Sequence, residues 1–230
     1  MAFVEVEGIS TTYGKATVLK KVSFSIERGE ITGLLGQNGC GKTTIIKVLA
    51  GILKPKEGEI RVDGKKIDRH FFTCCVGYCP QENSFFEKLT VRENIEYFGE
   101  LYGTKESVME SRIPEILGLL GLDGKMETAS GELSGGQKRR LNIACGIIHS
   151  PPVLLMDEPS LALDPLSRYN LWDLIKAISS KGTTVILSSN SLDEIYALCN
   201  SVVGIKNGSV MFHKTVKEMR MLKSLYPIFE

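Results

Sequence analysis

A glycine-rich stretch, GQNGCGKT from Gly36 to Thr43, is the feature that most constrains the fold of this 230-residue chain. It matches the phosphate-binding pattern G-x-x-x-x-G-K-[ST]. Glycines let the backbone curl until several N–H groups point at one anion, and the start of the following helix adds partial positive charge. An apolar strand is predicted just before the stretch, and a helix from Lys42 to about Gly51. This order of strand, loop and helix is the context that the pattern requires, so we predict a phosphate site.

Strands and helices alternate on both sides of this loop. Residues 3–6 and 22–26 alternate between apolar and polar and predict half-buried strands near the N-terminus. Apolar strands at 153–156 and 185–187 are each followed by a predicted helix. Helical connections between buried strands are typical of parallel sheets. We therefore expect an α/β fold with a mostly parallel sheet and an antiparallel β layer at the N-terminus.

The middle of the chain is predicted to be helical. Thr90 to Glu93 form a capping box, and apolar residues then recur at helical spacing. More helix follows, started or interrupted by Pro114. The length suits one domain with a subdomain. We expect a single domain over residues 1–230, with a core made of residues 1–82 and 151–230 and a helical subdomain made of residues 83–150.

Composition and charge argue against several classes of protein. The net charge of +1 gives no electrostatic reason to expect nucleic acid as a partner, and no apolar run approaches the ~20 residues of a membrane span. The six cysteines lack a paired C-x-x-C pattern, which argues against zinc and for a reduced cytosolic setting. We interpret most of them as small buried residues. We interpret the three histidines, His70, His149 and His213, as surface or local-packing residues.

Two carboxylates extend the predicted phosphate site. Asp157 and Glu158 follow the apolar strand at 153–156, where adjacent carboxylates are costly unless they meet a cation or face solvent. We predict that Lys42 reaches the β- and γ-phosphates and that Thr43 and Asp157 hold Mg²⁺. Glu158 then polarises the attacking water as a general base. The predicted nucleotide contacts of the loop are Gly36, Gln37, Asn38, Gly39, Cys40, Gly41, Lys42, Thr43 and Thr44.

A second glycine-rich helix start, LSGGQ, lies at Leu133 to Gln137. It precedes a helix predicted over residues 138–148 and makes a second anion site. One nucleotide does not need two such sites, so either the chain folds them together or two chains share nucleotides between them. A plain helix cap by Ser134 is the simpler alternative. The predicted contacts in this motif are Ser134, Gly135, Gly136 and Gln137.

Taken in order, these motifs resemble those of a nucleotide-binding domain of the ATP-binding-cassette (ABC) family, over essentially the whole chain. GQNGCGKTT resembles the Walker A motif, VLLMDEP the Walker B motif and LSGGQ the family signature. The resemblance implies a P-loop NTPase core with a helical signature subdomain, ATP and Mg²⁺ as cofactors, and ATP hydrolysis. It also implies a second cassette, so that each ATP is held by Walker A of one chain and LSGGQ of the other. ATP closes this sandwich and hydrolysis opens it.

Three further positions match the family in order. Tyr13 resembles the aromatic residue that stacks on adenine, and Gln81 resembles the Q-loop glutamine, which contacts Mg²⁺ or water and links the two subdomains. Asp164 resembles the D-loop aspartate that reaches across the dimer. The alternatives are a core or surface tyrosine, a turn glutamine and a simple N-cap for a helix at Pro165. Leu161 departs from the family, which more usually has a small polar residue there.

Asn190 stands where the family usually has a histidine that contacts the γ-phosphate and positions the water and Glu158. Asparagine can donate a hydrogen bond from its amide, but it is shorter and cannot take up a proton near neutral pH. We therefore expect intact ATP binding and slowed hydrolysis. Three explanations stay open. A different cassette supplies the competent second site, the chain cycles slowly with Glu158, or the asparagine is an engineered replacement.

Two segments resemble the drug- and lipid-export branch of the family. They are KRRL at 138–141 and FFEKLTVREN at 85–94. The resemblance implies a separate permease, whose coupling helix fits a groove near residues 84–102, and a peripheral position at the cytoplasmic face of the membrane. Two alternatives stay open. One is a non-transport cassette acting in DNA repair, translation or assembly, and the other is an unrelated phosphate-loop enzyme such as a small-molecule kinase.

Overall fold

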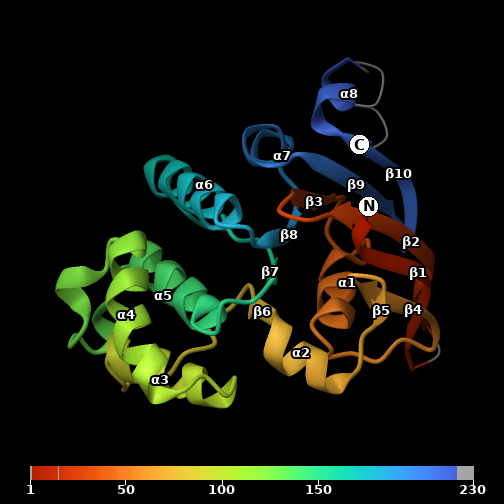
Figure 1. Cartoon of the computed structure of the whole chain (residues 1–230). Helices are drawn as coiled ribbons and strands as arrows, with labels where there is room; N and C mark the ends of the chain where they lie inside the picture. Colours follow the sequence, from red (N-terminus) through yellow and green to blue (C-terminus); the bar gives the residue numbers. More distant parts are fainter. Residues whose placement is uncertain (1, 15, 222–230) are drawn as a thin grey trace.

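The computed structural model describes residues 2–14 and 16–221, without the side chains of Tyr13, Arg69, His70 and Thr73. Strands predominate near the N-terminus, helices in the middle, and strands and helices alternate over residues 153–206 (Figure 1). The strands are β1 (Ala2–Tyr13), β2 (Ala16–Glu27), β3 (Ile31–Leu35), β4 (Glu57–Val62), β5 (Lys65–Lys66), β6 (Val76–Cys79), β7 (Val153–Met156), β8 (Thr184–Ser189), β9 (Ser201–Lys206) and β10 (Ser209–Thr215). The helices are α1 (Lys42–Leu49), α2 (Arg69–Cys75), α3 (Val91–Leu101), α4 (Glu106–Leu120), α5 (Gly135–Ile147), α6 (Pro165–Ser180), α7 (Leu192–Leu198) and α8 (Val216–Met221), with 3₁₀ turns at Asp123–Lys125 and Ser130–Glu132.

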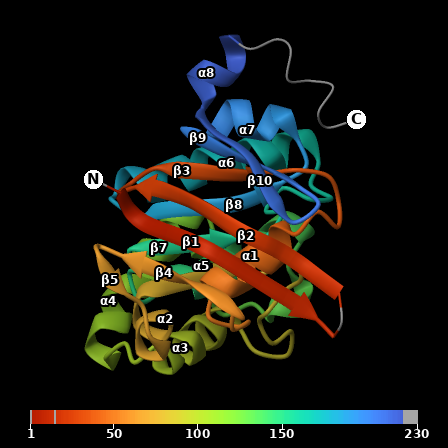
Figure 2. The same ribbon diagram turned by 90° about the vertical axis from the view of Figure 1, so that its right-hand side faces the viewer.

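The strands form two sheets. The larger has the order β10-β9-β3-β8-β7-β6, in which β10 pairs antiparallel with β9 and the other neighbours pair parallel. The smaller has the order β2-β1-β4-β5 and is antiparallel throughout. Its two long strands, β1 and β2, run across the front of the molecule in Figure 2. The predicted fold class, a mostly parallel sheet with an antiparallel N-terminal layer, is confirmed.

The central strands of the larger sheet are buried on both faces. Every residue of β3, β7 and β8 is buried. Side chains alternate between the two faces along a strand. On β8, Ile186 packs with α1 and the antiparallel sheet, whereas Val185 and Leu187 pack with the helices of the opposite face. Helix α1 therefore lies between the two sheets, and it begins near the carboxyl end of β3.

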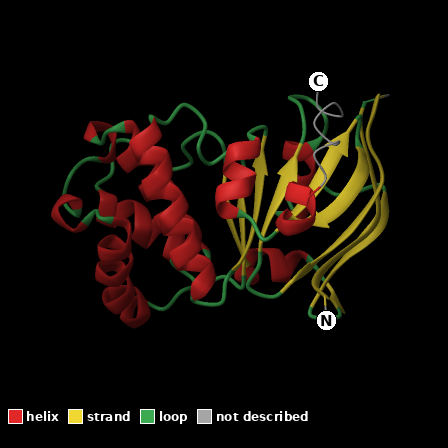
Figure 3. Cartoon of the chain, turned by 90° about the horizontal axis from the view of Figure 1, so that it is seen from above, coloured by secondary structure: helices red, strands yellow, loops and turns green. Residues whose placement is uncertain are grey.

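Helices α3, α4 and α5 pack on one another to one side of the larger sheet (Figure 3). The capping box predicted at the start of α3 is present, with Thr90 and Glu93 each bonded to the other's backbone N–H. The fully buried Asn94 donates to the carbonyl oxygens of Phe86 at 3.0 Å and Thr90 at 2.9 Å, which fixes the loop before α3. Within the described residues, no helix is long and apolar enough to cross a membrane.

Two features of this helical part differ from the predictions. The sequence predicts that Pro114 starts or interrupts a helix, but α4 continues through it. Proline leaves the carbonyl of Glu110 without its helical partner, and both residues are exposed, so water can bind that carbonyl. Helix α5 begins at Gly135 rather than at Lys138, because Ser134 caps it. The glycines of LSGGQ therefore form its first turn.

The histidine predictions are confirmed where the structure describes the side chain. His213 is exposed, and His149 packs locally, stacked on Tyr102 with the ring centroids 3.8 Å apart. The side chain of His70 lies outside the described residues. Burial lowers the pKa of His149 to about 4, although the backbone at Val76 favours the charged ring. His149 is therefore a neutral, partly buried residue at physiological pH.

We predict that His149 makes the folded protein sensitive to mild acid. The unfolded chain takes up a proton at this ring near the ordinary pKa of about 6.5, whereas the folded protein holds it neutral down to a pKa of about 4. Since the unfolded state binds more protons in this window, the free energy of unfolding falls as pH falls. His149→Phe keeps the stack on Tyr102 and removes the proton site. In urea titrations at about pH 7 and pH 5, this variant should lose less stability than the wild type. An equal loss in both would contradict the prediction.

Candidate nucleotide-binding site

The glycine-rich loop joins the carboxyl end of β3 to α1, and its backbone needs glycine at two points. Gly41 is the N-cap of α1 with a φ of 113°, a conformation that residues with a side chain rarely adopt. A Cβ atom at Gly36 would lie 2.4 Å from the carbonyl oxygen of Ile205. The loop therefore passes close to β9 and leads directly into α1, whose first N–H groups have no carbonyl partner within the helix. These groups have the geometry of an anion site.

Lys42 is held inside this loop. Its side chain is 4% exposed, and Nζ donates to the carbonyl oxygens of Gly36 at 2.8 Å and Gln37 at 3.1 Å. The same Nζ lies 3.6 Å from Oε1 of Glu158. The cation of the loop therefore sits between the loop backbone and the carboxylate at the end of β7.

The residues predicted to hold Mg²⁺ meet at the end of β7. Thr43 Oγ1 donates to Asp157 Oδ1 at 3.1 Å, and Asp157 is 2% exposed. Hydroxyl and carboxylate oxygens are the donors that Mg²⁺ prefers, and Mg²⁺ in proteins keeps water or phosphate oxygens for its other positions. Thr43 and Asp157 therefore fit the ion as a partial set of ligands. Gln81 is exposed and lines the same cavity as Thr43, so its side chain is able to act as a further ligand.

One cavity brings together segments that are far apart in the sequence. It is lined by the glycine-rich loop, by Gln81 after β6 and by Glu158 after β7. Gly36, Gln37 and Cys40 lie outside the lining, and burial raises the pKa of the Cys40 thiol. The residues that line the cavity are Val18, Asn38, Gly39, Gly41, Lys42, Thr43, Thr44, Gln81, Glu158 and Leu161.

Asn190 reaches the same region from the end of β8. It is exposed, and its Nδ2 lies 3.4 Å from Oδ1 of Asn38 in the glycine-rich loop, a long hydrogen bond. Asn190 and Glu158 also line a second, adjoining cavity. The structure therefore places Asn190 beside the loop and on a cavity that it shares with the carboxylate predicted to activate water.

The backbone at Glu158 is strained and is held by residues on either side. Glu158 has a φ of 45°, a conformation that costs a side-chain-bearing residue ~1–3 kcal/mol. The buried Arg139 of α5 donates to the carbonyl oxygens of Asp157 at 3.1 Å and Pro159 at 2.9 Å. The Glu158 N–H donates to Ser188 Oγ at 2.9 Å. These three hydrogen bonds hold the backbone at Glu158 and on both sides of it.

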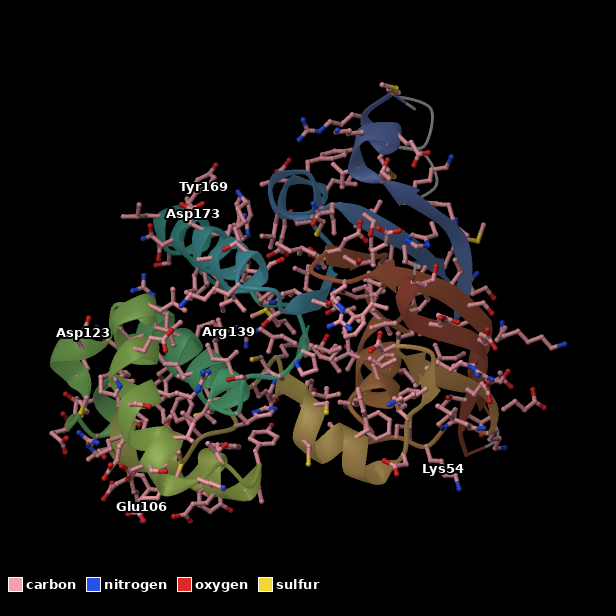
Figure 4. The ribbon with its side chains drawn as sticks, viewed as in Figure 1. Lys54, Glu106, Asp123, Arg139, Tyr169 and Asp173 are labelled. Carbon is pink, nitrogen blue, oxygen red and sulfur yellow. The ribbon has the colours of Figure 1, made fainter. Side chains whose placement is uncertain are left out.

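Arg139 also joins this turn to the segment that carries Gln81. Its Nη1 donates to the carbonyl oxygens of Pro80 at 2.7 Å and Gln81 at 3.3 Å. Figure 4 labels Arg139 on the part of α5 that faces the sheet. Burial lowers the pKa of this guanidinium, partly offset by nearby Asp157 and Glu194. One side chain therefore ties α5, the helix that begins within LSGGQ, to two loops of the cavity.

The signature motif and Asp164 lie elsewhere. Ser134 accepts from the Gln137 N–H at 3.4 Å, and the Gln137 side chain accepts from the Ser134 N–H at 3.0 Å, so the two form a capping box. Asp164 accepts from the Ser167 N–H at 3.0 Å, which makes it the N-cap of α6. Hydrogen bonding to the side chain and then to the backbone of Ser167 lowers the pKa of Asp164. None of the predicted signature contacts or Asp164 lines the cavity of the glycine-rich loop in the described structure. The prediction for Tyr13 concerns a side chain outside the described part.

Sequence reasoning assigned no site role to Arg139, Ser188 or Glu194. Ser188 Oγ donates to Asp157 Oδ1 at 2.5 Å while it accepts from the Glu158 N–H. A polar residue at the end of a buried strand was the available signal for Ser188. Arg139 follows LSGGQ on a helix, where an arginine is ordinarily a surface residue, so its role depends on tertiary packing alone.

The chain is similar to ABC transporter proteins in sequence. Residues 19–161 match the family described as ABC transporter. The chain is 36% identical over 209 residues to Nod factor export ATP-binding protein I of Paraburkholderia xenovorans (strain LB400), a match that covers 90% of this chain and 69% of that protein. It is 35% identical over 210 residues to linearmycin resistance ATP-binding protein LnrL of Bacillus subtilis (strain 168), covering 90% of this chain and 68% of that protein. The chain thus spans about two thirds of these relatives.

The fold is similar to solved structures over nearly the whole chain. One is cbiO1 from Clostridium perfringens, part of the ABC transporter complex cbiONQ, with a TM-score of 0.87, 28% identity and coverage of 99% of this chain and 96% of that one. Another is the ADP conformation of MJ1267, an ATP-binding cassette of an ABC transporter, with a TM-score of 0.90, 25% identity and coverage of 100% and 97%.

We predict that Ser188→Ala slows ATP hydrolysis roughly tenfold. The change leaves the part-buried Glu158 N–H without its partner, a loss of ~1–3 kcal/mol in the contacts that hold the turn. If about 1.4 kcal/mol of this loss falls on the positioning of Glu158 in the transition state, the rate falls tenfold. The matched control is Thr184→Ala at the other end of β8, whose hydroxyl accepts from the Gly29 N–H at 2.9 Å. It removes a hydrogen bond from the same strand but touches no residue of the cavity. Equal rate losses in steady-state assays of both variants would contradict the prediction.

Proposed function

Because the chain belongs to the ABC transporter family and is an ATPase of that family, we propose that its ATP hydrolysis drives export through a separate membrane permease. A subunit of an ABC transporter complex implies a permease partner. Export is supported by the names of two relatives, one for Nod factor export and one for linearmycin resistance. We place the chain at the cytoplasmic face of the membrane, held there by the permease. The small-molecule kinase alternative is set aside by the family match.

The observation that carries this proposal is the convergence of the predicted motifs on one cavity. The loop cation Lys42 lies 3.6 Å from the carboxylate of Glu158. Thr43 Oγ1 lies 3.1 Å from the carboxylate of Asp157. Gln81, from a third segment, lines the same cavity. A phosphate-binding loop, a partial Mg²⁺ shell and a candidate base in one place are what hydrolysis of a nucleoside triphosphate needs.

We assign the roles within this cavity as follows. The N–H groups of the loop and Lys42 bind the phosphates, and Thr43, Asp157 and Gln81 hold Mg²⁺. When bound, Mg²⁺ neutralises negative charge on the phosphates during the reaction. Glu158 accepts the proton of the attacking water, and its strained backbone aims the carboxylate at that water.

A second cassette completes the site in this proposal. Ser134 and Gln137 cap their own helix, Asp164 caps the next, and none of them lines the cavity in the described structure. Gly135 and Gly136, in the first turn of α5, offer N–H groups to an anion on another molecule. We propose that two chains close around two ATP molecules, with Tyr13 stacked on adenine and the helical part at residues 83–150 carrying the signature.

We predict that Glu158→Gln stops turnover and preserves ATP binding. Gln keeps the shape but cannot accept a proton, and loss of a general base typically costs ~10²–10⁴ in rate. The matched control is Glu106→Gln, an exposed glutamate of α4 (Figure 4). Steady-state ATPase assays should show loss only in the first variant. Light scattering after size exclusion should show ATP-dependent dimers of Glu158→Gln. Wild-type turnover in Glu158→Gln would refute the assignment of the base.

We predict that Asn190→His accelerates hydrolysis by up to ~10²-fold while ATP affinity stays within about twofold. A contact made to charge in the transition state is worth ~10²–10³ in rate, and the longer imidazole reaches further than the amide does. The comparison uses kcat from steady-state assays and ATP affinity from equilibrium titration. A faster variant identifies Asn190 as a brake. Equal rates that both exceed Glu158→Gln would instead mean that this position is dispensable here.

A further inference from the structure

Glu194 is a buried carboxyl group outside the residues assigned so far. It lies on α7 and is 4% exposed. It accepts hydrogen bonds from the hydroxyl of Ser160, from Trp172 Nε1 at 3.1 Å and from Ser189 Oγ at 2.6 Å. No ion pair to Glu194 is present among the described residues. Three neutral donors from three segments thus surround one carboxyl group.

Two of these donors belong to the segments that carry the proposed reaction. Ser160 follows Glu158 by two residues, and Ser189 directly precedes Asn190. All five of these side chains, Glu194 included, line the same cavity. The carboxyl group of Glu194 is therefore a bridge between the turn of the candidate base and the segment of Asn190.

The local sequence predicts a different hydrogen bond for Glu194, which the structure does not contain. Ser191 and Glu194 are spaced as a capping box at the start of α7, in which the glutamate would bond back to the Ser191 N–H. Ser191 does cap the helix, but its own N–H donates to Ser189 Oγ at 3.0 Å. The Glu194 side chain points instead to Ser160 and Trp172. The helix start is thus satisfied without it.

Burying a carboxyl group at the position of Glu194 would be unfavourable if the side chain served only to fill space. Burial of such a group is unfavourable unless hydrogen bonds compensate, and apolar residues of similar volume often serve a buried site as well or better. The carboxyl group of Glu194 accepts hydrogen bonds from all three donors, which an apolar side chain cannot do. The turn that it holds contains two side-chain-bearing residues with positive φ, Glu158 at 45° and Ala162 at 60°. Such a turn persists only where its surroundings fix it.

We infer that Glu194 is a positioning residue for ATP hydrolysis, because it joins Ser160 to Ser189 and so holds Glu158 and Asn190 as one unit. The inference rests on the proposed roles of Glu158 and Asn190. Arg139 fixes the backbone on both sides of Glu158, at Asp157 and Pro159, and Ser188 fixes it at Glu158 itself. Glu194 adds a contact further along the turn, at Ser160. Without the bridge, the two segments can move independently, while the phosphate-binding loop keeps its own contacts.

The test compares Glu194→Met and Glu194→Gln with the wild type. Methionine has a similar volume but no acceptor, so kcat should fall about tenfold or more while KM for ATP stays within about twofold. Glutamine keeps an acceptor for Ser160 and Trp172 and can donate to Ser189, so it should restore kcat to within about threefold. The matched control is Asp193→Asn, which removes an exposed carboxylate from the same turn and should behave as the wild type. Wild-type kcat in Glu194→Met, or equal losses in the Met and Gln variants, would overturn the inference.

If Glu194→Met does not fold, a double-mutant cycle tests whether Glu194 joins the two segments. Ser160→Ala and Ser189→Ala each remove one end of the bridge. If Glu194 joins the two segments, each change lowers kcat and the pair lowers it no further than the more severe single change. Multiplied losses would show independent segments and overturn the inference. Glu158→Gln, run alongside, keeps the outcomes apart, because wild-type turnover there refutes the proposed site rather than the bridge.

Discussion

Parallel pairing of three buried strands is the constraint on which the rest of this molecule depends. β3, β8 and β7 are neighbours in the sheet, and their registers bring Leu35 opposite Ser189 and Met156 opposite Leu187. Parallel strands end at the same edge, so the loops that follow them meet there. Burial on both faces fixes the register, since a slip by one residue would turn each strand's apolar side chains toward the wrong layer. The hydrophobic core therefore determines where the polar chemistry is assembled.

Polar contacts then hold the converging loops in shapes that the core alone does not dictate. Buried polar groups are stable only when they are paired, so a network of them specifies one arrangement and penalises others. Arg139 supplies four donated bonds to carbonyl oxygens, and Ser188 pairs a carboxylate and an N–H with one hydroxyl. Glu194 adds a third point of attachment. These residues explain how Glu158 keeps a φ of 45°.

Features encoded over short stretches could be predicted from the sequence, and features that depend on tertiary contacts could not. The glycine-rich loop and the helix start at Thr90 follow from neighbouring residues, and the structure has both. The continuation of α4 through Pro114 does not follow from the local sequence. Because Pro114 is exposed, water can replace the hydrogen bond that a proline removes inside a helix. Glu194 followed the spacing of a capping box, yet its partners come from other segments. Local spacing indicates which bonds are possible, and packing selects among them.

Asn190 is best understood through what surrounds it. The two residues before it are held by hydrogen bonds, from Ser188 to Asp157 and from Ser189 to Glu194. The side chain of Asn190 is exposed and makes one long hydrogen bond, to Asn38. The backbone is thus positioned firmly while the functional end stays adjustable. A histidine there would gain reach and a proton, but it would rely on the same backbone supports. The identity of residue 190 therefore sets the chemistry at this position, and the network beneath it sets the geometry in which that chemistry acts.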